Sequence, residues 1–298
     1  MILVAGGTGT LGTRLVRALT GSGMPVRVLT RDAGRASHLT GDGLEVHVGD
    51  IRDPNALAEA MRDVSAVVSA VQGFAGPDAV GAQAVDIDGN ANLTRAALAE
   101  GTRRFVLLSV AGAAPNSSFE LRRDKYRSEE ALMRSGLEWT VVRPTAYLET
   151  WLGLLADMIA SRGSATIFGR GNNPINFVSA SDVAALVENV LLSNEMVGAT
   201  LEIGGPEDLT LNGLAERLIA NHGTKVPIRH VPLPLLRLMS TLLRPIKPTI
   251  ATLASFGVAM DTNEMTLAHD TARAMVPELP ATRLADLLAA EPTRPRTH

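Results

Sequence analysis

The stretch GGTGTLG at Gly6–Gly12 decides the fold predicted for this chain. It follows the apolar run Met1–Ala5, which predicts a buried strand, and it leads into Gly12–Thr20, where apolar residues recur at helical spacing. Glycines at such a junction allow a tight turn, a close approach of the backbone to a pyrophosphate and close packing of the helix on the strand. The N-terminus of the helix adds backbone N–H groups and a favourable dipole for phosphate. The stretch therefore predicts a dinucleotide-binding turn; the alternative interpretation is a glycine-rich turn without a ligand.

Outward from this turn, apolar runs alternate with helical patterns through the first half of the chain. The further predicted strands are Val26–Thr30, Glu45–Gly49, Ala66–Val71, Phe105–Val110 and Thr140–Arg143. Predicted helices cover Pro54–Asp63 and the regions near 87–100 and 121–135. Near-continuous apolar strands separated by helices are typical of a parallel sheet that is covered on both faces. The predicted fold class is therefore α/β, with a Rossmann-type doubly wound parallel sheet.

The second half of the chain is less regular and predicts a smaller, mostly helical C-terminal substrate region. Helices are expected at 181–192, at 212–221, within 234–259 and at 281–290, and strands at 200–203 and 226–231. We expect residues 1–146, with a returning strand near 200–205, to bind the nucleotide, and residues 147–298 to form mainly the substrate-binding region. The apolar segment Val231–Met260 could wall a cavity for a bulky hydrophobic substrate, or it could be a subunit interface or ordinary core. The tail Pro292–His298 is expected to be frayed.

The residues that follow the second and third predicted strands bear on the choice between NAD and NADP. Arg31 follows the second strand, where a carboxylate would bind the ribose 2′-hydroxyl of NAD and an arginine suits the 2′-phosphate of NADP. Arg35 is a second candidate cation, although both arginines could instead be solvated loop residues. Asp50, followed by Ile51, could accept from the adenine amine, or Asp50 or Asp53 could cap the next helix. NADPH is therefore the expected cofactor, with NADH as the alternative.

Composition and charge exclude several classes of function. The chain has 298 residues, of which 46% are hydrophobic and 20% charged, as in a globular protein with a large core. A formal net charge of −3 leaves no excess of positive charge for nucleic-acid phosphates, so no nucleic-acid partner is expected. The absence of cysteine excludes disulfides and thiolate catalysis and suits a cytoplasmic protein. The histidines lack metal-ligand spacing, and charges and prolines interrupt the most apolar segment, so neither a metal site nor a membrane span is expected.

Two sets of short motifs occur together along this chain. The first comprises the Gly6–Gly12 turn, Thr30-Arg31, Gly49-Asp50 and Arg143-Pro144-Thr145. The second comprises Lys125 with Glu129, Ser135–Leu137, Trp139–Pro144, Phe177-Val178, Asp182–Ala184 and Ile203–Pro206. The first set resembles the short-chain dehydrogenase/reductase superfamily, and the second is similar to its atypical, NmrA-like branch. The resemblance spans roughly residues 1–220 and implies a nicotinamide near Ser69–Val71, Ser109–Ala111 and Pro144–Tyr147.

The residue patterns and this resemblance together give one set of expected cofactor-binding residues. They are Gly6, Thr8, Gly9, Thr10, Leu11, Gly12, Arg31, Arg35, Asp50, Ile51, Ala70, Val71, Lys125, Pro144, Thr145 and Ala146.

This chain departs from the superfamily pattern at the catalytic positions. Leu121 stands where a tyrosine usually precedes the lysine by four residues, and Ala111 stands where a serine usually follows the fifth strand. Lys125 remains; the resemblance implies an ammonium that bonds the nicotinamide ribose, and the alternative is a solvated helix lysine paired with an acid four residues on. Ser109 and Tyr147 are the other catalytic candidates, although a serine hydroxyl is a poor proton donor and Tyr147 could be a packing residue.

These residues and the resemblance imply an NADPH-dependent oxidoreductase of the ketoreductase type. The expected substrate is a bulky, hydrophobic ketone of the aromatic polyketide class found in antibiotic biosynthesis. A phenol beside the ketone could then supply the proton that the enzyme lacks, in a way that resembles angucyclinone-type ketoreductases. Two alternatives stay open: an NADP-binding, NmrA-like regulatory or redox-sensor protein without turnover, and an isoflavone-reductase-like reductase of another bond. The sequence predicts a small-molecule partner and leaves the oligomeric state undecided.

Overall fold

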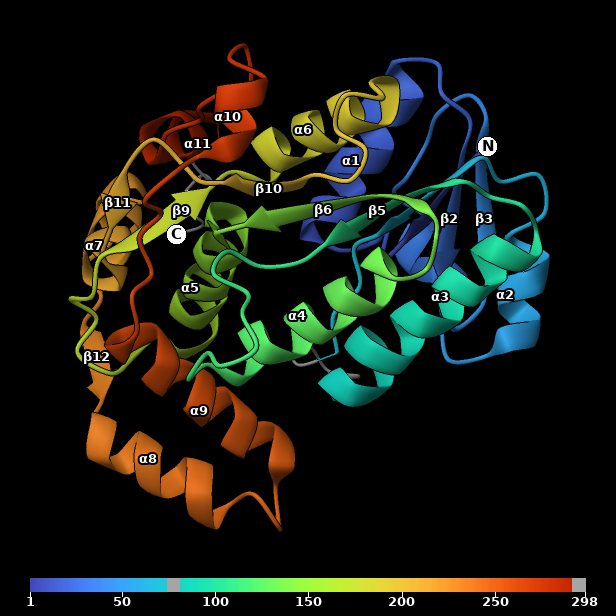
Figure 1. Cartoon of the computed structure of the whole chain (residues 1–298). Helices are drawn as coiled ribbons and strands as arrows, with labels where there is room; N and C mark the ends of the chain where they lie inside the picture. Colours follow the sequence, from blue (N-terminus) through green and yellow to red (C-terminus); the bar gives the residue numbers. More distant parts are fainter. Residues whose placement is uncertain (74–80, 291–298) are drawn as a thin grey trace. The chain divides into compact units, whose positions relative to one another are not determined.

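The computed structural model describes residues 1–73 and 81–290, and its first compact unit is built on a seven-stranded sheet (Figure 1). The strands are β1 (Ile2–Ala5), β2 (Val26–Thr30), β3 (Leu44–Val48), β4 (Ala66–Ser69), β5 (Arg104–Leu108), β6 (Glu138–Pro144) and β10 (Thr200–Ile203). Their order is β10-β6-β5-β4-β1-β2-β3, and every neighbouring pair is parallel. The strand order reverses between β1 and β4, which confirms the predicted doubly wound Rossmann-type sheet.

Helices cover both faces of this sheet, as the near-continuous apolar strands require. Figure 1 shows α1 and α6 on one face and α2, α3 and α4 on the other. Their bounds are α1 (Thr10–Gly21), α2 (Pro54–Ala60), α3 (Asp88–Ala99), α4 (Glu120–Met133) and α6 (Ala180–Leu192). A 3-10 turn, η1 (Ala33–Ala36), follows β2, a π-helical segment, η2 (Gln83–Ile87), leads into α3, and α10 (Thr271–Met275) also belongs to this unit.

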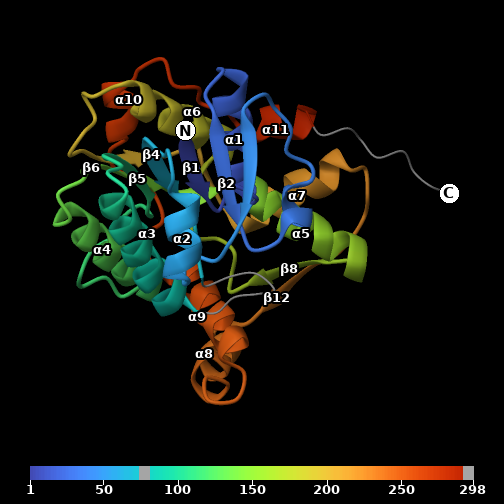
Figure 2. The ribbon, with the colours of Figure 1, turned by 90° about the vertical axis from the view of Figure 1, so that its right-hand side faces the viewer.

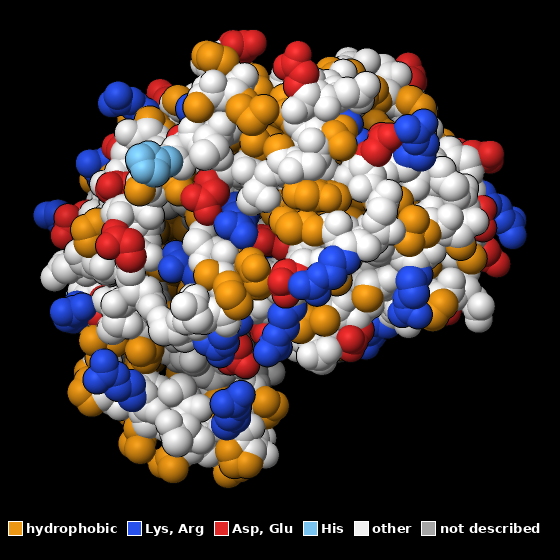
Figure 3. Space-filling view, in the orientation of Figure 1, with side chains coloured by type: hydrophobic (Ala, Val, Ile, Leu, Met, Phe, Trp, Pro, Cys, Tyr) orange, Lys and Arg blue, Asp and Glu red, His pale blue; other side chains and the backbone are white. Residues whose placement is uncertain are grey.

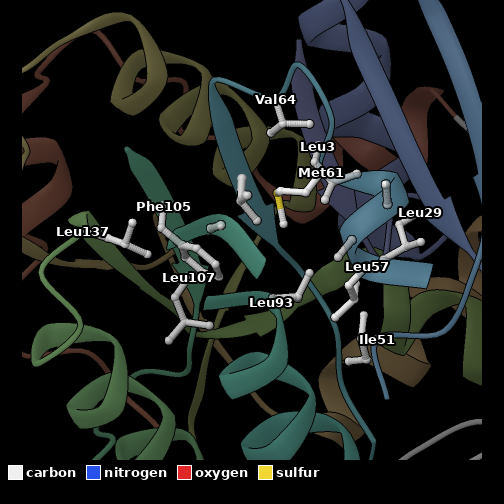
Figure 4. Packing of buried hydrophobic residues seen from close by; sticks show 14 of the residues in the cluster. Leu3, Leu29, Ile51, Leu57, Met61, Val64, Leu93, Phe105, Leu107 and Leu137 are labelled. Carbon is white, nitrogen blue, oxygen red and sulfur yellow. The ribbon is translucent and has the colours of Figure 1, made fainter. Parts of the chain in front are cut away.

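One hydrophobic cluster of the first unit lies between the sheet and helices α2, α3 and α4. Leu3, Leu57, Leu93 and Phe105 are fully buried there and pack in one cluster (Figure 4). Burying one such side chain stabilises the fold by about 1.5–3 kcal/mol. The sheet is therefore a fixed platform, and its carboxyl edge is held in place by the packing beneath it.

Of the described residues, the second compact unit contains Thr145–Ser179, Gly204–Ala268 and 281–290. Its helices are α5 (Leu148–Arg162), α7 (Leu211–Asn221), α8 (Leu233–Leu242), α9 (Pro248–Thr262) and α11 (Leu284–Ala290). Its strands are β7 (Ala146–Tyr147), β8 (Ala165–Phe168), β9 (Ile175–Val178), β11 (Asp208–Leu209) and β12 (Ile228–Val231). They form a three-stranded sheet, β11-β9-β7, and a two-stranded sheet, β12-β8.

The structure groups two later segments with the first unit, namely Ala180–Ile203 and His269–Pro280. Neither unit is therefore one continuous stretch of the chain. The reason is tertiary: β10 pairs with β6, and α6 packs against α1, so the chain returns to the first sheet after leaving it. That the second unit binds substrate stays a prediction.

Local differences from the predicted elements lie mostly in the second half. The helices expected within 234–259 are observed as α8 and α9, which are separate because Pro245 and Pro248 remove N–H donors and disfavour a continuous helix. The strand predicted from residue 226 begins at Ile228, directly after Pro227. Helix α5 and strands β8 and β9 were not predicted, because they are short or lack a clear apolar period. The predicted fraying of 292–298 lies outside the described residues.

Candidate cofactor-binding site

The glycine-rich turn between β1 and α1 uses its glycines for different purposes. Gly6 has a φ of +85°, and a Cβ atom there would lie 2.6 Å from the carbonyl oxygen of Ala70. A Cβ atom on Gly12 would lie 2.1 Å from the carbonyl oxygen of Gly6. At Gly9, by contrast, φ is −83° and the nearest atom to a built Cβ is at 3.4 Å. Gly6 and Gly12 are thus required by the fold of the turn, whereas the space beside Gly9 is open for a ligand.

The start of helix α1 has the character of a phosphate site. Its N-cap residue, Gly9, brings no side-chain cap, and the first turn contains no acidic residue. The helix dipole and the backbone N–H groups of a first turn attract anions, and an acid there would oppose phosphate. Thr8 and Thr10 are half-buried, and Leu11 lies on the buried face of α1. This cradle fits the pyrophosphate of a dinucleotide.

The carboxyl ends of the neighbouring strands bring other predicted residues to the same edge of the sheet. The N–H of Ala70 donates to the carbonyl of Ala5 at 2.9 Å, so Ala70 and Val71 lie beside the turn. On the other side, the N–H of Gly49 donates to the carbonyl of Thr30 at 2.9 Å. The segments after β1, β2, β3 and β4 are therefore adjacent, where open α/β sheets bind their ligands.

Arg31 and Asp50 follow adjacent strands, and both face the solvent side of this edge. Asp50 is engaged by Arg52, whose guanidinium donates to both of its carboxylate oxygens and forms an ion pair at 2.6 Å. The hydrogen bond from Arg52 lowers the pKa of Asp50, and the charge of Arg31 adds to the effect. Arg31 is exposed directly after β2, and Arg35 is exposed within η1.

A carboxylate, Asp32, also follows β2, and the hydrogen bond that it accepts bears on the choice between NAD and NADP. The side chain of Asp32 accepts from the N–H of Gly34 at 2.8 Å and so caps η1. A carboxylate that binds its own loop has one fewer lone pair for a ribose diol, whereas the exposed Arg31 lies at the position suited to a phosphate. The side chain of Ile51 packs in the core cluster against α3, and its expected contact with the cofactor stays a prediction.

Lys125, on α4, is almost fully buried and makes three contacts. Its Nζ lies 2.7 Å from Oδ1 of Asp86 and donates to the carbonyls of Val71 at 3.1 Å and Leu108 at 3.2 Å. One ion pair and two hydrogen bonds therefore hold the ammonium in place. The alternative interpretation, a solvated lysine paired with Glu129, is therefore wrong.

Asp86 lies at the centre of a buried polar network that none of the sequence motifs indicates. Its Oδ2 accepts from the N–H of Gly73 at 2.8 Å, and its carbonyl accepts from Asn90 at 2.7 Å and Ser128 at 2.5 Å. Asn90 in turn accepts from the hydroxyl of Ser69 at 2.5 Å. Asp86 and Asn90 are four residues apart and lie on one helical face. The sequence signal for this network was an acidic residue, Asp86, between the apolar Val85 and Ile87.

Ser109 belongs to a second buried network, centred on Glu129. Its hydroxyl donates to Glu129, whose carboxylate also receives two hydrogen bonds from Arg143, at 2.9 and 2.5 Å. Glu129 is fully buried, and Arg143 also lies 3.6 Å from Glu202. Burial by itself lowers the pKa of Arg143, but the bonds and charges of Glu129 and Glu202 outweigh it and raise that pKa. The Ser109 proton is thus committed to a carboxylate.

The remaining predicted residues lie at the end of β6 and in the second unit. Pro144 ends β6, and its carbonyl accepts from the N–H of Ala111 at 2.9 Å. Thr145, Ala146 and Tyr147 belong to the second unit, where β7 pairs with β9. Burial, with a smaller contribution from the charge of Glu149, raises the pKa of Tyr147 above its usual value. Their roles in cofactor binding and catalysis stay predictions.

The described residues contain no group of three or more His, Cys, Asp or Glu side chains that could hold a metal ion. Among the helices of residues 1–73 and 81–290, none is both long enough and apolar enough to span a bilayer.

Comparison with known proteins agrees with this geometry. A family profile described as NAD(P)H-binding matches residues 6–194. An NAD(P)H azoreductase of Xenophilus azovorans is 31% identical over 235 residues, which cover 79% of this chain and 78% of the relative. The photosystem II assembly factor Ycf39 of Synechocystis is 28% identical over 243 residues, covering 82% of this chain and 74% of the relative.

A solved structure shares the fold. The NADPH-dependent quinone oxidoreductase of Escherichia coli, complexed with NADPH, superimposes with a TM-score of 0.75 over 97% of this chain and 99% of its own, at 23% identity. The family match begins at Gly6, the first residue of the glycine turn. The open space beside Gly9 and the start of α1, which has no side-chain cap, both lie within the matched residues. This chain therefore belongs to the NAD(P)H-binding family of Rossmann-fold proteins, which includes NAD(P)H-dependent reductases.

Proposed function

We propose that this protein is an NADPH-dependent ketoreductase that acts on a bulky, hydrophobic ketone of the aromatic polyketide class. The observation that carries the proposal is the lack of a free protein acid at the superfamily's catalytic positions. Leu121 and Ala111 have no acidic proton, and the hydroxyl of Ser109 donates to the buried carboxylate of Glu129. A reductase with this arrangement suits a substrate that brings its own proton.

The chain's own residues bind and orient the reactants. NADPH supplies a hydride when it is bound. The Gly6–Gly12 turn and the start of α1 hold its phosphates, and Arg31 binds the 2′-phosphate. Lys125, fixed by Asp86 and two carbonyls, places a positive charge at the carboxyl edge of the sheet, where it stabilises negative charge.

The proton for the new alkoxide comes from the substrate in this proposal. A phenol beside the ketone, as in angucyclinone-type compounds, donates a hydrogen bond to the carbonyl from within the same molecule. Its ordinary pKa is near that of tyrosine, about 10, so it replaces the missing tyrosine chemically. Tyr147 is the competing donor, but its raised pKa makes it a weaker acid than a free phenol.

The relatives support a reductase of conjugated or aromatic acceptors. An azoreductase and a quinone oxidoreductase are named for acceptors of that kind. We assign substrate binding to the second unit, where the partly buried Trp151 and Phe256 stack with ring centroids 6.3 Å apart and pack against the buried core.

Turnover with a matched pair of substrates tests the proposal. NADPH absorbance is followed with a phenolic polycyclic ketone and with its O-methyl ether. The ether is expected to react at least about 10²-fold more slowly, the lower end of what general acid catalysis contributes. Tyr147→Phe is expected to leave turnover of the phenolic ketone within about tenfold. Undiminished reduction of the ether, or a large loss in Tyr147→Phe, would show that a protein acid supplies the proton.

A non-catalytic role is the second candidate, and the similarity to the assembly factor Ycf39 favours it. A regulatory or redox-sensor protein would bind NADPH tightly and consume none with any ketone in the panel. An isoflavone-reductase-like enzyme would consume NADPH but leave the carbonyl intact in the isolated product. Product analysis and a binding titration on the same sample therefore separate the three roles.

A further inference from the structure

Helices α8 and α9 expose large apolar side chains in the second unit. On α8, Leu235, Leu238 and Leu242 share one face at helical spacing, and their exposed fractions are 45%, 53% and 59%. The connection to α9 adds Ile246, which is 74% exposed, and α9 adds Ile250 and Leu253. Leu236, on another face of α8, is fully buried and holds the helix in place. Figures 1 and 2 together show α8 and α9 next to each other, joined by a turn at one end.

Apart from the buried Asp261 near the end of α9, the charged residues of α8, α9 and the turn between them are all basic. No aspartate or glutamate occurs between Arg217 and Met260, a stretch that carries six lysines and arginines. Three of these, Arg237, Arg244 and Lys247, are exposed on α8 and the turn. In Figure 3, hydrophobic side chains edge the part of the surface that corresponds to α8 and α9, and basic groups lie among them. The chain as a whole is slightly acidic, so this surface is a local exception.

We propose that the α8–α9 surface, formed by these six apolar and three basic residues, docks on the interface of an anionic lipid bilayer. Apolar side chains flanked by lysine and arginine are typical of helices that lie in the headgroup region. Each basic residue near an anionic leaflet adds attraction that salt screens. Helices of 10 and 15 residues are too short to span, so the protein would lie on the membrane surface.

Charge complementarity decides between this occupant and a second copy of the chain. A symmetric dimer through this surface would bring like charges together, because it carries no acid to pair with its own cations. An anionic bilayer satisfies both the apolar and the cationic side chains. This inference does not depend on the proposed ketoreductase activity.

Vesicle co-sedimentation of the full chain tests the proposal. The probes are vesicles of phosphatidylcholine alone and of phosphatidylcholine with about one third phosphatidylglycerol. We expect binding to the anionic vesicles that weakens as salt rises, and little binding to the neutral ones. The apolar variant L238Q/L242Q/I246Q and the charge variant R237E/K247E should each bind at least about tenfold more weakly. The matched controls, Leu192→Gln at an exposed leucine of α6 and Arg62→Glu at an exposed arginine of the first unit, should bind like the unaltered chain.

Each contrary result has a distinct meaning. No binding to anionic vesicles, or equal losses in the control variants, would overturn the membrane proposal. A dimer in light scattering that the apolar variant abolishes would assign the surface to a second copy instead. A raised KM for the ketone in the apolar variant, with vesicle binding absent throughout, would assign it to substrate. Far-ultraviolet circular dichroism and the melting temperature confirm that each variant is folded.

Discussion

At the scale of single residues, we expect Arg31 to determine the preference for NADPH over NADH. It is exposed directly after β2, and the neighbouring Asp32 is occupied in capping η1. We expect the unaltered protein to bind NADPH more tightly than NADH. Arg31→Ala should remove most of that preference, because a charge-assisted bond to the 2′-phosphate is worth about 1.5–3 kcal/mol. Fluorescence titration with both cofactors measures it, with Arg62→Ala as the control. Equal affinities in the unaltered protein would contradict the assignment.

Asp86 and Lys125 form the buried ion pair of the site, and its loss should reduce stability sharply. Asp86→Asn leaves the ammonium of Lys125 without its counter-charge, at 7% side-chain exposure, and is expected to lower the free energy of unfolding by about 3–5 kcal/mol. Asp88→Asn, at an exposed acid two residues on, should change it by less than about 0.5 kcal/mol. Urea denaturation measures both, and equal stabilities of the two variants would show that the pair is unimportant for folding.

The double variant D86N/K125M separates the structural role of Lys125 from its role toward cofactor. Removing both charges leaves no unpaired buried ion, so stability should recover relative to Asp86→Asn alone. If Lys125 binds the nicotinamide ribose, NADPH affinity should stay reduced in the stable double variant. Recovery of both stability and NADPH affinity would limit Lys125 to a structural role.

At the scale of elements, the turn between β1 and α1 should separate folding from binding. Gly9→Val is expected to abolish cofactor binding with little loss of stability, since φ at Gly9 is −83° and a Cβ atom there meets nothing closer than 3.4 Å. Gly12→Ala should instead destabilise the protein, because its Cβ would lie 2.1 Å from a carbonyl oxygen. Calorimetry of each variant with and without NADPH measures both effects.

Gly21→Ala serves as the control for the turn, because a Cβ atom at Gly21 has no neighbour within 4 Å. It should neither destabilise the protein nor weaken NADPH binding. A Gly9→Val variant that melts normally and still binds NADPH would place the cofactor elsewhere.

At the scale of the whole molecule, NADPH should stabilise the chain through its first unit. At about a hundredfold excess over Kd, binding to the folded state alone adds about 2.7 kcal/mol, which for a chain of this length corresponds to a rise in Tm of roughly 4 °C. Hydrogen exchange should slow at the Gly6–Gly12 turn and after β4. Protection confined to the second unit, or an unchanged Tm, would contradict a site at the carboxyl edge of the seven-stranded sheet.

The sequence by itself determined the doubly wound sheet and the place of the cofactor turn. Both follow from local patterns: apolar runs such as Met1–Ala5 form strands because they are buried on both faces, and the spacing of Gly6, Gly9 and Gly12 suits a turn against a phosphate. These patterns act over a few residues, so they can be read without knowing which distant segments meet.

Tertiary structure alone decided the partners of the polar residues and the boundaries of the units. Lys125 could have paired with Glu129 one helical turn away, but the sheet order brings Asp86 to it, and Glu129 takes Arg143 and Ser109 instead. A buried charge must find its counter-charge among whatever the packing places beside it, and that choice depends on long-range strand order. For the same reason, local periodicity showed that the segment of α8 and α9 is apolar but not which of its faces is buried.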